Sequence, residues 1–158
     1  MLLSKELNDA LNEQVIHELR NVLKYMQIAS YFEDLELNNI AKYFLDQSNH
    51  EKDHADKFMS HINDRVGGAV NITSVSSPEL SMENPIEIAR QYLKVEQETT
   101  TSIEGIYQLA FIQNSYIDLP FLQEMLNEQV EEEDSANKFL VKIQKVNDLV
   151  IFDATFGE

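Results

Sequence analysis

Six polar side chains interrupt otherwise apolar seams along the chain, and together they could bind metal ions. They are Glu18, Glu51, His54, Glu96, Gln129 and Glu132. The spacing Glu51-x-x-His54 places both side chains on one face of a helix. Such a pair alone is a weak indicator, whereas its coincidence with seam carboxylates in the other segments is a strong one. Oxygen ligands with one imidazole suit iron or manganese better than structural zinc, which prefers Cys and His.

The same carboxylates pose an electrostatic problem if they lie in a protein core. A buried carboxylate without a partner costs several kcal/mol. No Lys or Arg occupies a seam near their level, so salt bridges do not solve the problem. Two divalent cations would cancel the charge of four carboxylates and leave His54 as a neutral nitrogen ligand. The alternative is that the glutamates lie at the seam edge in solvent, as most glutamates do. That explanation suits one glutamate better than four.

Long helices are expected to position these residues. Apolar side chains recur at alternating spacings of three and four, as in an amphipathic helix, over residues 5–34, 39–65, 85–113 and 119–146. The residues Asn84-Pro85-Ile86-Glu87 provide the N-cap, first-turn proline and acidic side chain that begin a helix. Helices of this length span roughly 40–45 Å. Because their lengths are similar, the middle of each seam should lie in one layer.

The connections predict how the helices are arranged. Short connections after the first and third helices make the helices on either side antiparallel neighbours. The segment 66–83 could extend about 60 Å, which is enough to run the length of a bundle. We therefore predict an all-α fold, a four-helix bundle of two antiparallel pairs joined by a long crossover. Residues 147–158 would form a short C-terminal segment, and 1–158 a single domain.

Composition narrows the class of protein. The 158 residues include 12 Lys and Arg against 28 Asp and Glu, and no Cys, for a net charge of −16. Without cysteine, the chain has no disulfide, thiolate metal site or thiol nucleophile. The charge argues against nucleic acid as a partner and suits a protein that gathers cations or stays soluble. No apolar run is long enough to span a membrane, and no signal peptide begins the chain, so we expect a cytoplasmic protein.

Several other side chains have more than one interpretation. Tyr25 lies two helical turns from Glu18 and could be a redox partner, although a core tyrosine bonded to a carboxylate is the favoured interpretation. We expect His61 to be a core histidine with its hydrogen bonds satisfied. His17 and His50 lie off the seams and are expected to be exposed.

Three stretches of sequence resemble those of a known family. They are residues 11–19, with Leu-Asn-Glu-Gln followed by Glu18-Leu19, residues 29–35, Ala-Ser-Tyr-Phe-Glu-Asp-Leu, and residues 127–133, Asn-Glu-Gln-Val-Glu-Glu-Glu. The first two are similar to the first helix, and the third to the fourth helix, of ferritins of the bacterial non-haem type. The resemblance covers residues 5 to about 146.

The resemblance implies a ferritin-like fold, an iron site and an activity. The implied ligands of a first iron are Glu18, Glu51 and His54, and those of a second are Glu51, Glu96 and Glu132. Glu51 would bridge the two ions, and Gln129 would lie beside the second. The family acts as a ferroxidase: it couples two Fe(II) ions to O₂ and moves Fe(III) into the cavity of a 24-chain homo-oligomeric shell. Iron storage and detoxification would follow.

The sequence departs from the family at several positions. A third iron site of the family uses a Glu where this chain has His50, while Glu128 and Glu131 are kept, so a third site is left open. Lys52 stands where bacterioferritins carry their haem-binding Met, so we expect no haem. The segment 149–156 is shorter than the fifth helix that usually lines the family's four-fold channels, which leaves the number of chains open.

Two other functions remain compatible with the residues. One is a discrete di-metal oxidase or peroxidase that turns over a small substrate and stores no mineral. The other is a purely structural bundle whose seam glutamates are exposed at the edge.

Overall fold

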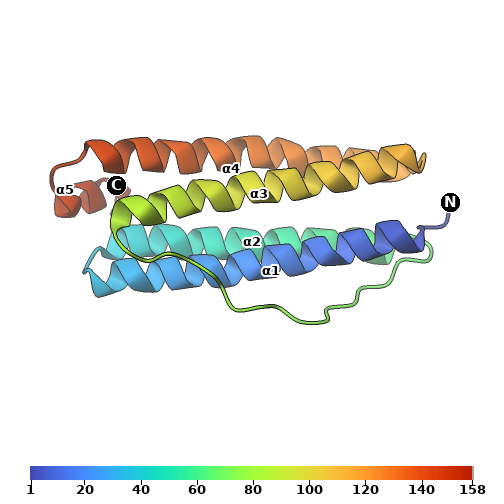
Figure 1. The fold of residues 1–158 in the computed structure, drawn as a ribbon, viewed down its shortest axis with the longest axis horizontal. Helices are drawn as coiled ribbons and strands as arrows, with labels where there is room; N and C mark the ends of the chain where they lie inside the picture. Colours follow the sequence, from blue (N-terminus) through green and yellow to red (C-terminus); the bar gives the residue numbers. More distant parts are fainter. Residues whose placement is uncertain (158) are drawn as a thin grey trace.

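The computed structural model describes residues 1–157, and these contain helices and no strand. The elements are α1 (Lys5–Asp34), α2 (Asn38–Asp64), α3 (Pro85–Ile112), a 3₁₀ turn (Tyr116–Asp118), α4 (Leu119–Lys145), α5 (Leu149–Ala154) and a second 3₁₀ turn (Thr155–Gly157). The predicted all-α bundle with a short C-terminal segment is confirmed (Figure 1). None of the helices described is long and apolar enough to cross a membrane.

Side-chain caps begin three of these helices. The Ser4 hydroxyl accepts a hydrogen bond from the Leu7 N–H at 3.1 Å at the start of α1. Asn84 accepts one from the Glu87 N–H at 2.9 Å, as the cap pattern before α3 predicts. Asp148 caps α5 in the same way. Each cap satisfies a backbone donor that has no partner within its helix.

The helices form two antiparallel pairs, α1 with α2 and α3 with α4, and α1 also packs against α3. The crossover between α2 and α3 runs along the bundle from one end to the other (Figure 1). Side chains of α1 anchor it: Asn12 donates to the Ala69 carbonyl at 2.9 Å and accepts from the Asn71 N–H at 2.6 Å. Arg20 donates to the Ser76 hydroxyl at 2.9 Å. The crossover is therefore ordered by contacts with α1.

Two separate apolar clusters make up the core. The first includes Tyr25, Phe32, Phe44, Tyr92 and Phe139, and the second includes Leu7, Leu11, Phe58, Ile103 and Leu122. Along each of the four long helices, one cluster ends before the middle of the helix and the other begins after it. A polar layer therefore separates two apolar regions that exclude water above and below it.

The tail packs on the bundle of its own chain. Phe152 of α5 is buried, with its ring centroid 5.8 Å from that of Phe139 and 5.0 Å from that of Phe156. The Asp153 carboxylate accepts a hydrogen bond from the Ile40 N–H at 2.8 Å, at the start of α2. These contacts extend the first apolar cluster to the end of the bundle.

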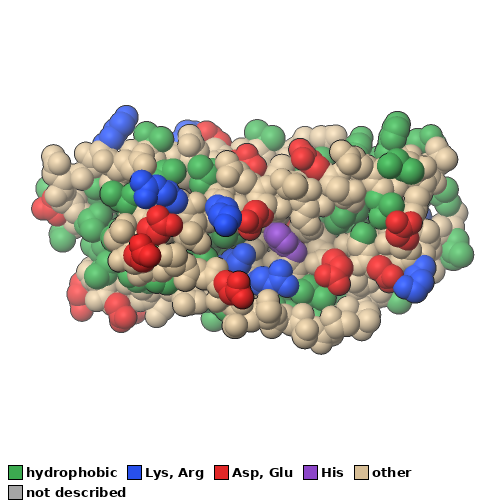
Figure 2. All heavy atoms as spheres, in the orientation of Figure 1, with side chains coloured by type: hydrophobic (Ala, Val, Ile, Leu, Met, Phe, Trp, Pro, Cys, Tyr) green, Lys and Arg blue, Asp and Glu red, His purple; other side chains and the backbone are tan. Residues whose placement is uncertain are grey.

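On the face drawn in Figure 2, acidic side chains are interspersed with Lys and Arg.

Candidate metal centre

The polar layer brings together side chains from all four long helices. Glu18 comes from α1, Glu51 and His54 from α2, Glu96 from α3 and Gln129 from α4. All five are buried, and the three glutamates have no exposed surface. The glutamates of this set therefore lie inside the bundle, so the edge-exposed alternative does not hold for them.

Glu18, Glu51 and His54 form the tightest group. Each offers one ligand atom, and these atoms all lie within 4.8 Å of one another. The His54 Nδ1 atom is 3.6 Å from Glu51 Oε2 and 3.9 Å from Glu18 Oε2. Among the residues that the structure describes, the ion-pair contacts of Glu18 and Glu51 involve only this imidazole, so no Lys or Arg neutralises them.

Several buried ligand atoms in the layer have no hydrogen-bond partner. They are Glu18 Oε2, both carboxylate oxygens of Glu51, His54 Nδ1 and Gln129 Oε1. Buried polar atoms are nearly always hydrogen-bonded, and adjacent acceptors without donors repel one another. A metal cation would satisfy such a set. Carboxylate oxygens with one imidazole nitrogen are ligands that suit iron or manganese, so the residues present fit the predicted ion.

The remaining carboxylate oxygens are held by polar neighbours. Gln14 donates to Glu18 Oε1 at 2.8 Å, and its own carbonyl accepts from the Ser102 hydroxyl at 2.5 Å. The Tyr25 hydroxyl donates to Glu96 Oε1, and Gln129 Nε2 donates to Glu96 Oε2 at 3.1 Å. These bonds hold the carboxylates of Glu18 and Glu96 in place, while both oxygens of Glu51 remain without a partner.

Burial and like charge disfavour ionisation of the cluster. Burial raises the pKa of Glu18 well above its ordinary value, and the charge of Glu51 raises it further. Burial, followed by the charge of Glu96, does the same for the pKa of Glu51. Burial and the charge of Glu96 raise the pKa of Glu132 to about 7. A divalent cation would reverse these shifts, because it stabilises the charged carboxylates.

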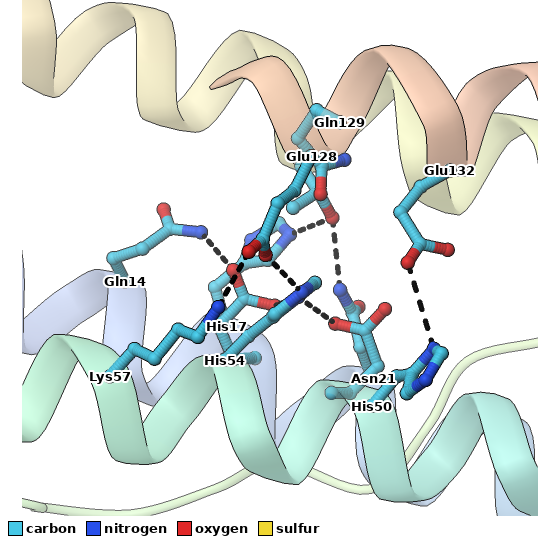
Figure 3. A network of polar contacts seen from close by, with 12 residues as sticks. Gln14, His17, Asn21, His50, His54, Lys57, Glu128, Gln129 and Glu132 are labelled. Atoms are coloured by element: carbon cyan, nitrogen blue, oxygen red, sulfur yellow. Dashed lines mark hydrogen bonds and ion pairs between the residues drawn. The ribbon is translucent and has the colours of Figure 1, made fainter. Parts of the chain in front are cut away.

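An open cleft leads from the surface to this layer. It has a volume of about 310 Å³ and is lined by His50, Asp53, His54, Lys57, Glu128, Glu131 and Glu132. His50 is exposed, as expected, and its Nδ1 lies 3.8 Å from Glu132 Oε1. Glu131 is exposed and Glu132 is half-buried, so both lie at the cleft rather than in the sealed core. Figure 3 shows His50 pointing toward Glu132.

The structure confirms the predicted surroundings of Tyr25 and His61 and contradicts those of His17. The expected contact of Tyr25 with a carboxylate is confirmed, while a redox role for it stays a prediction. His61 is largely buried and its Nε2 lies 2.8 Å from Asp118 Oδ1, as expected of a core histidine. The prediction that His17 is exposed is wrong. Its Nε2 lies 2.8 Å from the Thr99 hydroxyl between α1 and α3, and burial lowers its pKa to about 4.

Two contributors to the site were missed. Gln14 precedes Glu18 by one helical turn and is buried on the same face, a spacing that pairs polar side chains on helices. Lys57 follows His54 by three residues and reaches Glu128 of α4, with Nζ 2.5 Å from Oε1. Both could have been found by searching the turns adjacent to each predicted ligand.

Comparison with known proteins identifies the family. The family model described as a ferritin-like domain matches residues 8–146. The chain belongs to the ferritin family. The bacterial non-heme ferritins of Staphylococcus aureus strain USA300 and Staphylococcus haemolyticus strain JCSC1435 are 31% and 30% identical to it. Each alignment spans 147 residues, which is 93% of this chain and 88% of the relative.

Solved structures agree with this assignment. An open pore ferritin from the archaeon Archaeoglobus fulgidus superimposes with a TM-score of 0.93 at 26% identity, covering 98% of this chain and 96% of that one. A closed form of the Archaeoglobus ferritin, engineered by mutagenesis, gives the same values. Family, fold and the buried Glu-Glu-His group together support iron storage and ferroxidase activity for this ferritin in general terms.

The raised pKa values predict how the stability of the metal-free ferritin depends on pH. A carboxyl with a raised pKa in the folded state makes folding less favourable as pH rises through that pKa. We expect the free energy of unfolding, measured by denaturant titration with a chelator present, to fall between pH 6.5 and pH 8.5. This range lies above the ordinary pKa of His17, whose lowered value acts in the opposite direction at lower pH.

A variant tests the origin of this dependence. Glu18→Gln removes one buried charge, so we expect it to stabilise the metal-free protein at pH 8, because burial and the charge of Glu51 oppose ionisation of Glu18. Glu13→Gln is the control, because Glu13 is exposed on the same helix. A Glu18→Gln variant that is less stable than wild type at pH 8 would contradict the account.

Proposed function

We propose that this ferritin binds two Fe(II) ions per chain in the polar layer and oxidises them with O₂. The observation that carries the proposal is the set of buried polar atoms without hydrogen-bond partners on α1, α2 and α4, where ligand atoms of Glu18, Glu51 and His54 lie within 4.8 Å of one another. Five such atoms in one layer would be costly in a structural bundle. Iron is the substrate in this reaction, and the layer provides its binding site.

The proposed ligands are the carboxylates and the imidazole of the polar layer and its cleft. Glu18, Glu51 and His54 bind the first ion, since their ligand atoms form the tightest group. Both oxygens of Glu51 lack a hydrogen-bond partner, so Glu51 can bridge to a second ion. Glu96 would bind that ion through the lone pairs that its bonds from Tyr25 and Gln129 leave free. Glu132 binds the second ion from the cleft side, a position consistent with the effect of the Glu96 charge on its pKa.

Each Fe(II) gives one electron to O₂. The residues of the chain make that transfer possible because they hold the two ions side by side in the polar layer. Tyr25 and Gln129 hold Glu96 by hydrogen bonds and so fix one wall of the site. The apolar clusters on both sides keep bulk water away, and the cleft with Glu131 at its mouth admits cations. The net charge of −16 raises the local concentration of Fe(II) around the protein.

Storage is the second half of the proposal. Fe(III) leaves the layer and accumulates as mineral inside a shell of identical chains, with 24 chains in the complete assembly. The match to bacterial non-heme ferritins and to the Archaeoglobus ferritins over nearly the whole chain supports this assignment. The proposed product site is therefore the cavity of an oligomer, outside the single bundle.

Removing the bridging carboxylate tests the oxidation step. We expect Glu51→Gln to slow Fe(II) oxidation by at least about 100-fold in stopped-flow absorbance, because displacement of a reacting group by about 1 Å can have an effect of this size. Glu104→Gln is the matched control, since Glu104 is an exposed glutamate of α3. Oxidation at the wild-type rate in Glu51→Gln would reject the assigned site.

Counting retained iron tests storage. Fe(II) is added stepwise in air, and the iron that stays in solution with the protein is measured per chain after gel filtration. We expect retention far above the two or three ions that one bundle can bind. Saturation at about two ions per chain, with the excess precipitating, would keep the di-iron centre and replace storage with the discrete oxidase function.

A further inference from the structure

Glu128 differs from the other carboxylates of the cleft because residues of α2 engage both of its oxygens. Lys57 Nζ donates to Oε1 at 2.5 Å, and His54 Nε2 lies 2.9 Å from Oε2. Figure 3 shows Lys57 and His54 both pointing from α2 toward Glu128 on α4. The resemblance to ferritins implies that Glu128 binds a third iron, but in this arrangement that ion would have to compete with the positive charge of Lys57.

The contact with Glu128, the shortest that a carboxylate makes with the His54 ring, favours a proton on Nε2 over one on Nδ1. A negatively charged carboxylate oxygen 2.9 Å from Nε2 attracts a proton on that nitrogen electrostatically. In the neutral ring, a proton on Nε2 leaves a lone pair on Nδ1. Nδ1 is the buried atom without a partner, and it faces the free oxygens of Glu18 and Glu51. The imidazole thus presents a metal-binding lone pair to the centre.

Lys57 has the position needed to keep Glu128 in place. Glu128 is partly exposed, with 29% of its side chain accessible, so water could compete for its oxygens. Lys57 lies on the same face of α2 as His54, three residues later, and holds the far oxygen while the near one remains against the ring. Among the described residues, Lys57 forms its ion pair with Glu128 and none with the other cleft-lining acidic residues, Asp53, Glu131 and Glu132.

We propose that Lys57 and Glu128 are positioning residues that hold His54 with Nδ1 directed into the metal centre. The inference rests on the proposed function, since it concerns how the same centre binds its ion. Partners of a metal-ligating histidine commonly change metal affinity by about 10–100-fold when they are removed. If Glu128 were instead a ligand of a third ion, Lys57 would compete with that ion, and removing Lys57 would strengthen binding.

Co(II) binding to the full-length metal-free protein separates the two roles, because Co(II) is stable in air and its visible absorption changes when the ligands or the geometry around the ion change. We expect Lys57→Met and Glu128→Gln each to weaken the tightest Co(II) site by roughly 10–100-fold and to change its absorption. Lys57→Arg should stay within about threefold of wild type, because it keeps the charge-assisted hydrogen bond. Circular dichroism and gel filtration verify that the variants fold and assemble.

The matched control is Lys52→Met, which removes the same charge from α2. Lys52 is exposed and pairs with Asp56 at 2.6 Å, so this variant should leave the affinity for Co(II) unchanged. Tighter binding in Lys57→Met, or equal affinity in Lys57→Met and Lys52→Met, would overturn the positioning role. Loss of one ion per chain in Glu128→Gln, with the nitrogen-ligated site unaffected, would overturn it as well.

Glu51→Gln distinguishes failure of this inference from failure of the proposed function. If wild type and Glu51→Gln bind Co(II) equally, or wild type binds none, the metal centre itself is wrongly assigned, and the positioning role falls with it. If Glu51→Gln loses the site, the centre stands, and the comparison of Lys57→Met with Lys52→Met then decides the role of Lys57 and Glu128.

Discussion

Three fully buried glutamates with no adjacent Lys or Arg among the described residues are the constraint on which the rest of the structure depends. Glu18, Glu51 and Glu96 come from three helices, and their charges meet in one layer. Their raised pKa values express the same conflict, because burial favours the protonated forms of all three, and neighbouring carboxylate charges add to this for Glu18 and Glu51. A bundle built only for stability would place apolar side chains here. The layer is therefore best understood as a site completed by cations.

The fold is arranged so that this layer can exist. Apolar clusters fill the bundle on both sides of it and provide the stability that the polar layer does not. The long crossover makes α3 begin at the same end of the bundle as α2, so these two helices run parallel and Glu96 comes to the level of Glu51. Tyr25 links the layer to the first apolar cluster, since its ring packs against Phe44 and its hydroxyl donates to Glu96.

Much of this arrangement could be predicted from the sequence, because helical periodicity is a strong signal. Apolar spacing and connection length predict the four long helices and their pairing. They also predict that Glu18, Glu51 and His54 lie in one layer of the bundle. Periodicity assigns a residue to a face, but it does not show how far a long polar side chain reaches. Lys57 and Gln14 were missed for that reason, and His17 was placed in solvent although it bonds to Thr99. Where Phe152 of the tail packs likewise depends on tertiary contacts.

The central claim is that iron occupies the polar layer between the two apolar clusters. Anomalous X-ray diffraction at the iron edge, from crystals of the full-length protein soaked with Fe(II) under nitrogen, tests it most directly. The account predicts two iron peaks per chain in the bundle core, one bonded to Glu18, Glu51 and His54, the other to Glu51 and Glu96. Peaks confined to exposed carboxylates such as Glu131, with none in the core, would contradict it.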